Sequence, residues 1–251
     1  MATPLLIGTA NVLSSLDSVA AGAVVDDLLG HGPDLVGLQE WGLVRYPLLR
    51  ERGRVRLLAG WLRGRGAGRT GYSWLAPLAG GCAVGARLDR LEPVGAVLRL
   101  LSGPGRADRG SREVPVRPPR LAVVATYRDR QDGATLTFVN YHLMPAVQAH
   151  GRYRTDRPLL VGAHRQEVRT LNRIVQVHRA LGHVVYAAGD SNFDGFRLDD
   201  LTSAWAGRAD EPGTFGRRRI DDVHGPGPAT SVRVLTNPSD HKAVLARVPR
   251  G

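Results

Sequence analysis

Short apolar runs that end in polar residues recur along this chain, and they predict buried strands with polar side chains at their ends. Leu5–Val12 and Asp34–Glu40 are the first two such runs. Between them, apolar residues spaced three and four apart predict a helix over Ser14–Leu29, with a serine as its N-cap. This strand–helix–strand unit places Asn11 and Glu40 at neighbouring strand ends, and in an open α/β sheet such ends converge on a site.

The same patterns continue to the end of the chain. Leu121–Tyr127 and Thr135–Tyr141 are predicted to form a hairpin, because the turn signal Asp132-Gly133 lies between them. His164–Leu181 has helical spacing and is closed by a glycine. The other predicted strands are Gly81–Arg87, Val94–Leu101, Val184–Ala188, Ile220–Val223 and Ala243–Val248.

Two stretches show little periodicity. Tyr46–Arg69 is dense in arginine, and Gly103–Pro119 is rich in proline, glycine and arginine, so both are expected to be irregular. Neither an internal repeat nor a linker that would divide the chain is apparent. A chain of 251 residues can bury a substantial core, and we expect one domain over residues 1–251.

The composition is that of a soluble globular protein, with 43% hydrophobic residues and a mean hydropathy of -0.17. No apolar run is long enough to cross a bilayer, and the N-terminus lacks the basic and apolar segments of a signal peptide. Cys82 is the only cysteine, which excludes an intrachain disulfide and a cysteine-rich metal site. We therefore expect a cytoplasmic monomer without stable membrane association.

The formal net charge of +11 favours binding to phosphate groups. Lys242 is the only lysine, so nearly all of the basic residues are arginines, which bind phosphate in a bidentate manner. Codon bias in a GC-rich genome explains the same excess of arginine equally well. The charge supports a phosphate-bearing substrate without identifying one.

Asp190 and Asn192 follow a predicted strand and a glycine. In an extended segment, residues two apart project to the same side, so both side chains could address one atom. A carboxylate that takes a proton from water, beside a carboxamide that holds this water, suits attack on phosphorus. The alternative is an Asx turn, in which the two side chains satisfy local backbone groups.

Glu40 stands at the end of an apolar strand, where an unpaired carboxylate is costly to bury. A hard divalent cation such as Mg²⁺ is one remedy, and a salt bridge to an arginine is another. Asn11 could add an oxygen ligand beside Glu40, or it could cap the following helix.

His142 and His241 each adjoin a predicted strand and are candidates to contact phosphate oxygens or to accept a proton. Either Asp221 or Asp222 could orient one of the imidazoles, and the spacing does not decide between them. We interpret the remaining histidines as surface or scaffold residues; they are His31, His150, His164, His178, His183 and His224.

Taken in order, these motifs resemble the endonuclease/exonuclease/phosphatase superfamily, whose fold is that of deoxyribonuclease I. The resemblance spans nearly the whole chain. The motifs that carry it most specifically are Leu38-Gln39-Glu40, Gly189-Asp190-Ser191-Asn192, Arg219-Ile220-Asp221 and Ser239-Asp240-His241.

The resemblance implies an α/β fold, a four-layered sandwich of two packed mixed sheets flanked by helices. It also implies hydrolysis of a phosphoester by direct attack of water, with Mg²⁺ or Mn²⁺ as the cofactor. The metal ligands implied are Glu40, Asn11 and Asp240. The catalytic residues implied are Asp190 and Asn192 at the water, and His142 and His241, with Asp221 supporting His241, at the phosphate.

Three functions are compatible with this site. The first is a nuclease on DNA or RNA, which predicts that the arginine-rich segments Arg50–Arg69, Gly103–Arg120 and Arg152–Arg157 grip the backbone. The second is hydrolysis of a phosphoinositide, a phospholipid or a small phosphoester, for which Trp61 and Trp74 in loops could touch a membrane. The third is a relative that binds phosphate groups without cleaving them.

Overall fold

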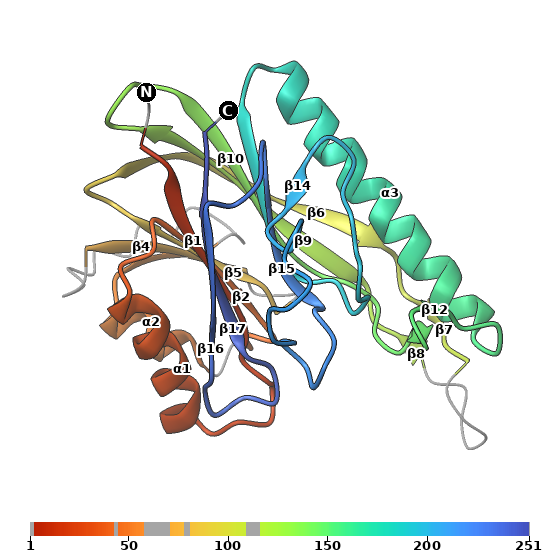
Figure 1. Cartoon of the computed structure of the whole chain (residues 1–251). Coiled ribbons are helices and arrows are strands. Elements are labelled where there is room, and N and C mark those ends of the chain that lie inside the picture. The colour runs from red at the N-terminus through yellow and green to blue at the C-terminus, as the bar shows by residue number, and fades with distance from the viewer. Residues whose placement is uncertain (1–2, 43–44, 58–70, 78–80, 109–115, 251) are drawn as a thin grey trace.

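The computed structural model describes residues 3–42, 45–57, 71–77, 81–108 and 116–250. Two large mixed sheets pack face to face, and helices cover the outer face of each sheet (Figure 1). This arrangement is the four-layered α/β sandwich expected from the sequence. No helix in the described ranges is both long enough and apolar enough to span a membrane.

The first sheet has seven strands in the order β16-β17-β1-β2-β5-β4-β3. β1 and β2 run parallel, which places Asn11 beside Gln39 at their ends. The strands are β1 (Leu5–Asn11), β2 (Leu35–Gln39), β3 (Arg54–Leu57), β4 (Tyr72–Ala76), β5 (Ala83–Arg87), β16 (Ser231–Leu235) and β17 (Ala243–Val248).

The second sheet has six strands in the order β14-β15-β13-β10-β9-β6. Its strands are β6 (Leu91–Ser102), β9 (Arg120–Asp129), β10 (Thr135–His142), β13 (Val184–Asp190), β14 (Thr202–Ser203) and β15 (Asp221–Gly225). β10 and β13 are parallel and end with His142 beside Asp190, while antiparallel β15 places Asp221 opposite Asp190. Two small hairpins complete the strands: β7 (Gly105–Arg106) with β8 (Val116–Arg117), and β11 (Gln148–Ala149) with β12 (Arg152–Tyr153).

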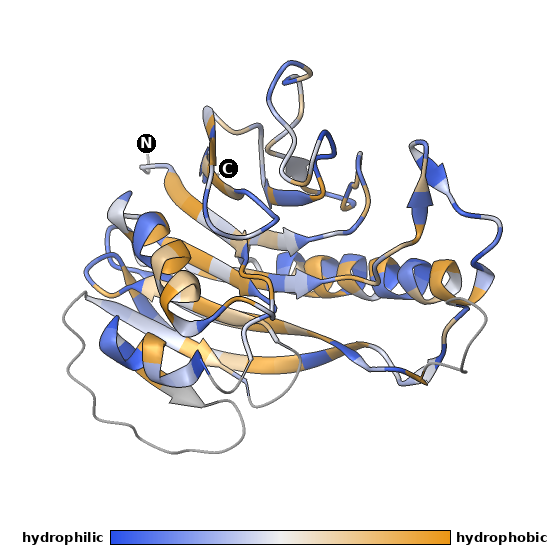
Figure 2. Ribbon diagram, turned by 90° about the horizontal axis from the view of Figure 1, so that it is seen from below, coloured by the Kyte–Doolittle hydropathy of each residue, from blue (hydrophilic) through white to orange (hydrophobic). Residues whose placement is uncertain are grey.

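Three helices flank the sheets in the described part of the chain. The outer face of the first sheet packs against α1 (Ser18–Gly30) and α2 (Tyr46–Glu51), and that of the second packs against α3 (Pro158–Ala180). The largest apolar cluster lies between the sheets. Figure 2 shows the hydrophobic residues concentrated along the central strands, while the loops are mostly hydrophilic. This core therefore fixes the position of one sheet against the other. The ends of strands from both sheets meet at one edge.

Several element boundaries differ from the predictions. α1 begins at Ser18, because the side chain of Asp17 and not a serine accepts the N-cap hydrogen bond. The stretch expected to be irregular contains α2 and β3, and β4 and β16 were not predicted. The short length of these elements explains the omissions, since apolar periodicity is hard to recognise over four to six residues.

The placement of Trp74 in a loop was also wrong. Trp74 lies in β4 and is fully buried, with its ring against Tyr72 and its indole N–H donating to the carbonyl of Arg52. It cannot contact a membrane in this fold. Trp61 lies outside the described residues, as do parts of the arginine-rich segments Arg50–Arg69 and Gly103–Arg120.

Candidate active site

Asp190 lies at the centre of the cluster of polar side chains at this edge. It is the last residue of β13, and its exposed fraction is 1%. Its Oδ2 accepts a hydrogen bond of 3.0 Å from Asn11 Nδ2. The Nε2 atoms of His142 and His241 lie 3.5 and 3.9 Å from the same oxygen. Asn11 lies 179 positions before Asp190 in the sequence, and it meets this carboxylate oxygen together with the two histidines.

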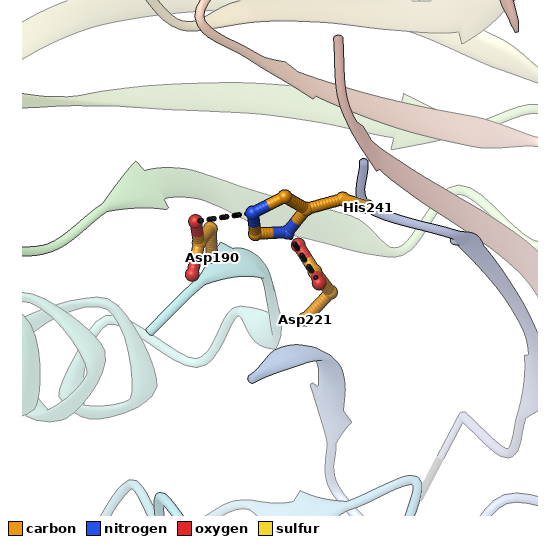
Figure 3. Close-up of side chains that lie close together, drawn as sticks. All are labelled: Asp190, Asp221 and His241. Atoms are coloured by element: carbon orange, nitrogen blue, oxygen red, sulfur yellow. Dashed lines mark hydrogen bonds and ion pairs between the residues drawn. The ribbon is translucent and has the colours of Figure 1, made fainter. Parts of the chain in front are cut away.

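His241 approaches Asp190 from the segment before β17, with Asp221 behind it (Figure 3). The Nδ1 of His241 lies 2.9 Å from Asp221 Oδ2, which leaves Nε2 turned toward Asp190. Burial alone would lower the pKa of His241, but the bond to Asp221 and the charges of both aspartates outweigh it and raise the pKa to about 9. His241 is therefore an imidazolium at neutral pH.

The other two titratable groups around Oδ2 are shifted by burial. Burial raises the pKa of Asp190 to about 7, and the charge of Asp221 adds to this effect. Burial and, to a smaller extent, the positive charge of Arg120 lower the pKa of His142 to about 3. The site thus combines a carboxyl group that titrates near neutrality with one charged and one neutral imidazole.

Glu40 is joined to Asp190 through Asn11. The amide nitrogen of Asn11 donates to Glu40 Oε1 at 3.3 Å as well as to Asp190, while its oxygen accepts the N–H of Leu13 at 3.1 Å. Asp17 caps α1, so Asn11 has no capping role. In this orientation the amide nitrogen of Asn11 bridges the carboxylates of Glu40 and Asp190. The amide oxygen of Asn11 could bind a cation there only if the side-chain amide were rotated by about a half turn, which would exchange its oxygen and nitrogen.

The carboxylate of Glu40 forms no salt bridge among the described residues, although the charges of Arg45 and His142 act on it. Its Oε2 accepts the backbone N–H of Ser14 at 2.8 Å, and no arginine or lysine forms a salt bridge with it. The same holds for Asp190, whose ion-pair partners in the described ranges are histidines. The described part of the structure therefore contains no Glu40–arginine salt bridge, which was the alternative to a bound cation.

Asn192 does not lie as the sequence predicted. The chain leaves the extended conformation after Asp190, and Asn192 has a φ of 53°. Its backbone N–H donates to Asp190 Oδ1 at 2.8 Å, and its side chain donates to the carbonyl of Leu143 at 3.1 Å. The Asx turn is thus present, and the expectation that both side chains project to one side was wrong. Asn192 fixes Oδ1 of Asp190, which leaves Oδ2 facing the site.

Asp240 lies at the rim of the cluster. It is exposed, and its Oδ1 accepts a hydrogen bond of 3.4 Å from the adjacent Ser239. No hydrogen bond joins Asp240 to Asn11 within the described residues. The hydroxyl of Ser239 also donates to the backbone carbonyl of Asn11 at 2.8 Å, so the loop that carries Asp240 is anchored to the end of β1.

Two residues near the site were not singled out from the sequence. Arg120 begins β9, and its Nε is buried without a hydrogen-bond partner among the described residues. Phe215 packs against His241 with ring centres 4.7 Å apart, and the guanidinium of Arg218 lies 4.9 Å from the Phe215 ring centre. An aromatic residue just before three consecutive arginines was the available signal for Phe215; nothing distinguished Arg120 among so many arginines.

Comparisons with known proteins bear on the fold. A scan against models of protein families and a search of curated proteins each find no match. Among solved structures, TDP2 from D. rerio in complex with a single-strand DNA product matches with a TM-score of 0.65 and 14% identity over 98% of each chain. An endonuclease/exonuclease/phosphatase from Bacteroides vulgatus matches with a TM-score of 0.65 and 18% identity over 100% of both chains.

A third structure with this fold is a mannosyl-6-phosphatase from Bacteroides thetaiotaomicron, with a TM-score of 0.62 and 16% identity over 98% of this chain and 99% of that one. The fold is therefore that of the endonuclease/exonuclease/phosphatase structures, the deoxyribonuclease I-like fold, as the motifs predicted. Since the three proteins differ in what their names say they act on, the fold leaves the substrate open.

Proposed function

We propose that this protein is a metal-dependent phosphoester hydrolase that cleaves DNA or RNA. The observation that carries the proposal is the convergence of Asn11, His142 and His241 on one oxygen of Asp190, with Glu40 joined through Asn11. A base, an imidazolium and an unpaired carboxylate within one cluster are the groups that in-line attack of water on phosphorus requires.

In the proposed mechanism, Asp190 accepts a proton from the attacking water through Oδ2. Its pKa of about 7 suits a general base near neutral pH, because a stronger acid would hold the proton too weakly. Asn192 and Asn11 fix its two oxygens, so the carboxylate is oriented before the substrate binds.

The imidazoles and Arg120 address the phosphoryl oxygens. His241 is held charged by Asp221 and can donate from Nε2 to an oxygen that gains negative charge. Neutral His142 can donate one further hydrogen bond. The Nε of Arg120 has no hydrogen-bond partner among the described residues, and the charge of Arg120 acts on His142, so Arg120 is a candidate to bind the phosphate itself.

The residues at Glu40 fit a hard divalent cation. Glu40 and Asp190 meet at Asn11, and neither forms a salt bridge with an arginine or lysine in the described ranges, so their carboxylate oxygens are available as ligands. We expect Glu40 to hold Mg²⁺ or Mn²⁺, with Asp240 close to it. Such an ion supplies Lewis-acid stabilisation of the phosphoryl oxygens.

A different cluster also has the composition of a metal site. Ligand atoms of Asp190, Asp221 and His241 lie within 4.8 Å of one another. We interpret this group as a base and a histidine–aspartate pair, because Nδ1 of His241 already makes a hydrogen bond of 2.9 Å with Asp221.

Phe215 and Arg218 support a nucleic acid over a small phosphoester. The half-buried Phe215 ring lies against His241, so a base next to the scissile phosphate could stack on its open part or on the Arg218 guanidinium. Stacking on aromatic rings and arginine planes is how proteins bind single strands without sequence preference. A small phosphate ester without a planar base lacks the group that stacks best on this platform.

The test is hydrolysis of labelled single-stranded DNA, duplex DNA and RNA, beside phospholipids and small phosphate esters, with Mg²⁺, with Mn²⁺ and with EDTA. We expect cleavage of nucleic acid that EDTA abolishes. Phe215→Ala should raise KM for an oligonucleotide several-fold and leave KM for a small phosphate ester without an aromatic ring unchanged. Cleavage of small esters alone would favour the phosphatase alternative. Binding of nucleic acid without turnover under every metal condition would favour the non-catalytic alternative.

A further inference from the structure

A buried arginine lies directly behind the metal-binding end of the site. Arg45 has an exposed fraction of 2%, and in the described part of the chain it forms no salt bridge. Its guanidinium instead donates to a ring of backbone carbonyls. These are Val12 at 3.2 Å, Leu13 at 2.9 Å, Ser14 at 2.9 Å, Leu16 at 2.7 Å and Glu40 at 3.5 Å. A buried charge is costly unless it is fully hydrogen-bonded, and the carbonyls supply that compensation.

The carbonyls belong mainly to one turn, Val12–Leu16, between β1 and α1. The turn contains no glycine, yet Leu13 has a φ of 42°, a left-handed conformation that costs a residue with a side chain roughly 1–2 kcal/mol. Four of its carbonyl dipoles converge on one point. Without a cation at that point the dipoles would repel one another, so the shape of the turn depends on Arg45.

The same turn holds two side chains of the candidate active site. Its Ser14 N–H donates to Glu40 Oε2 at 2.8 Å, and its Leu13 N–H donates to Asn11 Oδ1 at 3.1 Å. Glu40 itself has a φ of 55°, and its carbonyl is one of the five acceptors of Arg45. The contacts thus run from the guanidinium to the turn, and from the N–H groups of the turn to Asn11 and Glu40.

We propose that Arg45 is a positioning residue that holds the turn Val12–Leu16, and that it thereby sets Glu40 for the metal and Asn11 for its bonds to Glu40 and Asp190. Its consequence for metal affinity rests on the proposed function; its control of the turn does not. Because Arg45 places these groups before the cation arrives, its loss should weaken metal binding, in the way that groups supporting metal ligands usually change affinity by roughly 10- to 100-fold.

The first measurement is Mn²⁺ affinity, read by electron paramagnetic resonance of the free ion, for wild type, Arg45→Lys and Arg45→Met. We expect Kd to rise about tenfold or more in Arg45→Met, and less in Arg45→Lys, which keeps a cation but not the planar fork. Arg90→Lys is the matched control. Arg90 is also buried, but it pairs with Asp129 and the carbonyl of Thr3, away from the site. The Arg90→Lys variant should therefore be less stable than wild type, and its Kd for Mn²⁺ should be unchanged.

The second measurement is hydrogen exchange of the Leu13 and Ser14 amides in metal-free protein. Both should be protected in wild type and exchange at least tenfold faster in the Arg45 variants, while core amides of β1 stay protected. Unchanged Mn²⁺ affinity and unchanged exchange at Ser14 in a folded Arg45 variant would overturn the proposal. If Arg45→Met does not fold, Arg45→Lys decides. Wild type that binds no Mn²⁺ would count against the proposed function, and the exchange data would still decide the role of Arg45.

Discussion

Two histidine–aspartate pairs begin at neighbouring positions of β15, and they have opposite properties. Asp221 points to the side of the sheet that faces the other sheet, where it binds His241 at 2.9 Å. Asp222 points to the opposite side, where its Oδ2 lies 3.3 Å from Nε2 of His224 and accepts the Ser203 hydroxyl at 2.6 Å. The alternation of side chains along a strand separates the two pairs.

Their surroundings set their charges. In the first pair the imidazole pKa is raised to about 9 and His241 is charged. In the second, burial raises the pKa of Asp222 to about 8 and lowers that of His224 to about 3. Both members of the buried pair are therefore largely neutral at pH 7. A histidine beside an aspartate is therefore charged where the carboxylates around it outweigh burial, and neutral where burial outweighs them.

The largest expected effect comes from removing the imidazole of the first pair. His241→Ala should lower kcat on nucleic acid by roughly 10³–10⁴-fold, because the group that stabilises negative charge on the phosphoryl oxygens is lost. Circular dichroism and the melting temperature should show an intact fold. Turnover within tenfold of wild type would exclude His241 from the chemistry.

A smaller effect should separate the two aspartates. Asp221→Asn removes the charge that keeps His241 protonated and should lower kcat by roughly 10²-fold or more. Asp222→Asn has the same shape as the neutral acid and should leave kcat within about twofold of wild type. Equal losses in both variants, measured at one pH and metal concentration, would contradict the division of roles.

The buried pair should matter for stability instead of rate. His224 is fully enclosed and packs edge-on against Phe196, so His224→Ala should lower the free energy of unfolding by about 2–4 kcal/mol through the cavity it leaves. Urea unfolding measures this change, and kcat below the melting temperature should be close to that of wild type. A loss of turnover without a loss of stability would assign His224 to the active site.

The smallest expected effect is a dependence of stability on pH. The folded-state pKa of Asp222 is about 8, above its value in the unfolded chain, so the folded protein binds more protons between about pH 4 and pH 8. The contribution of Asp222 to stability is therefore fully present below pH 4 and is lost as pH rises through 8. Asp222→Asn should remove this loss. The free energy of unfolding of the variant, minus that of wild type, should therefore be larger at pH 9 than at pH 6, as measured by urea unfolding. If the free energies of unfolding of wild type and variant changed with pH in parallel, the raised pKa of Asp222 would be contradicted.

Much of the fold could be predicted because its signals are local. The bounds of β17 agree with the predicted strand Ala243–Val248, and β9 and β10 form the hairpin expected around Asp132-Gly133. The start of α1 could not be predicted from a serine cap, because residues 12–16 form the turn held by Arg45, some thirty positions away. The edge strand β16 was missed because it is short, and its exposed Ser231 and Arg233 interrupt the apolar pattern further.

The candidate site shows the same division. The sequence places Asn11, Glu40, His142 and Asp190 at or just beyond strand ends, and the structure brings them together. It could not show that Asn192 turns back onto Leu143, that Asp240 stays at the rim, or that Arg120 Nε has no hydrogen-bond partner within the described residues. These are contacts between residues whose relative positions depend on loop conformation and on side-chain packing.

By itself, the sequence determined the alternation of strands and helices, and with it the chemical groups that stand at the edge where the strands end. Periodicity and residue order are enough for this, because a strand turns alternate side chains to opposite faces whatever surrounds it. The packing of the two sheets determines which aspartate faces His241, which groups are charged, and that Arg45 donates to the turn behind Glu40. Those properties depend on burial and on distances across the packed sheets, which no local pattern contains.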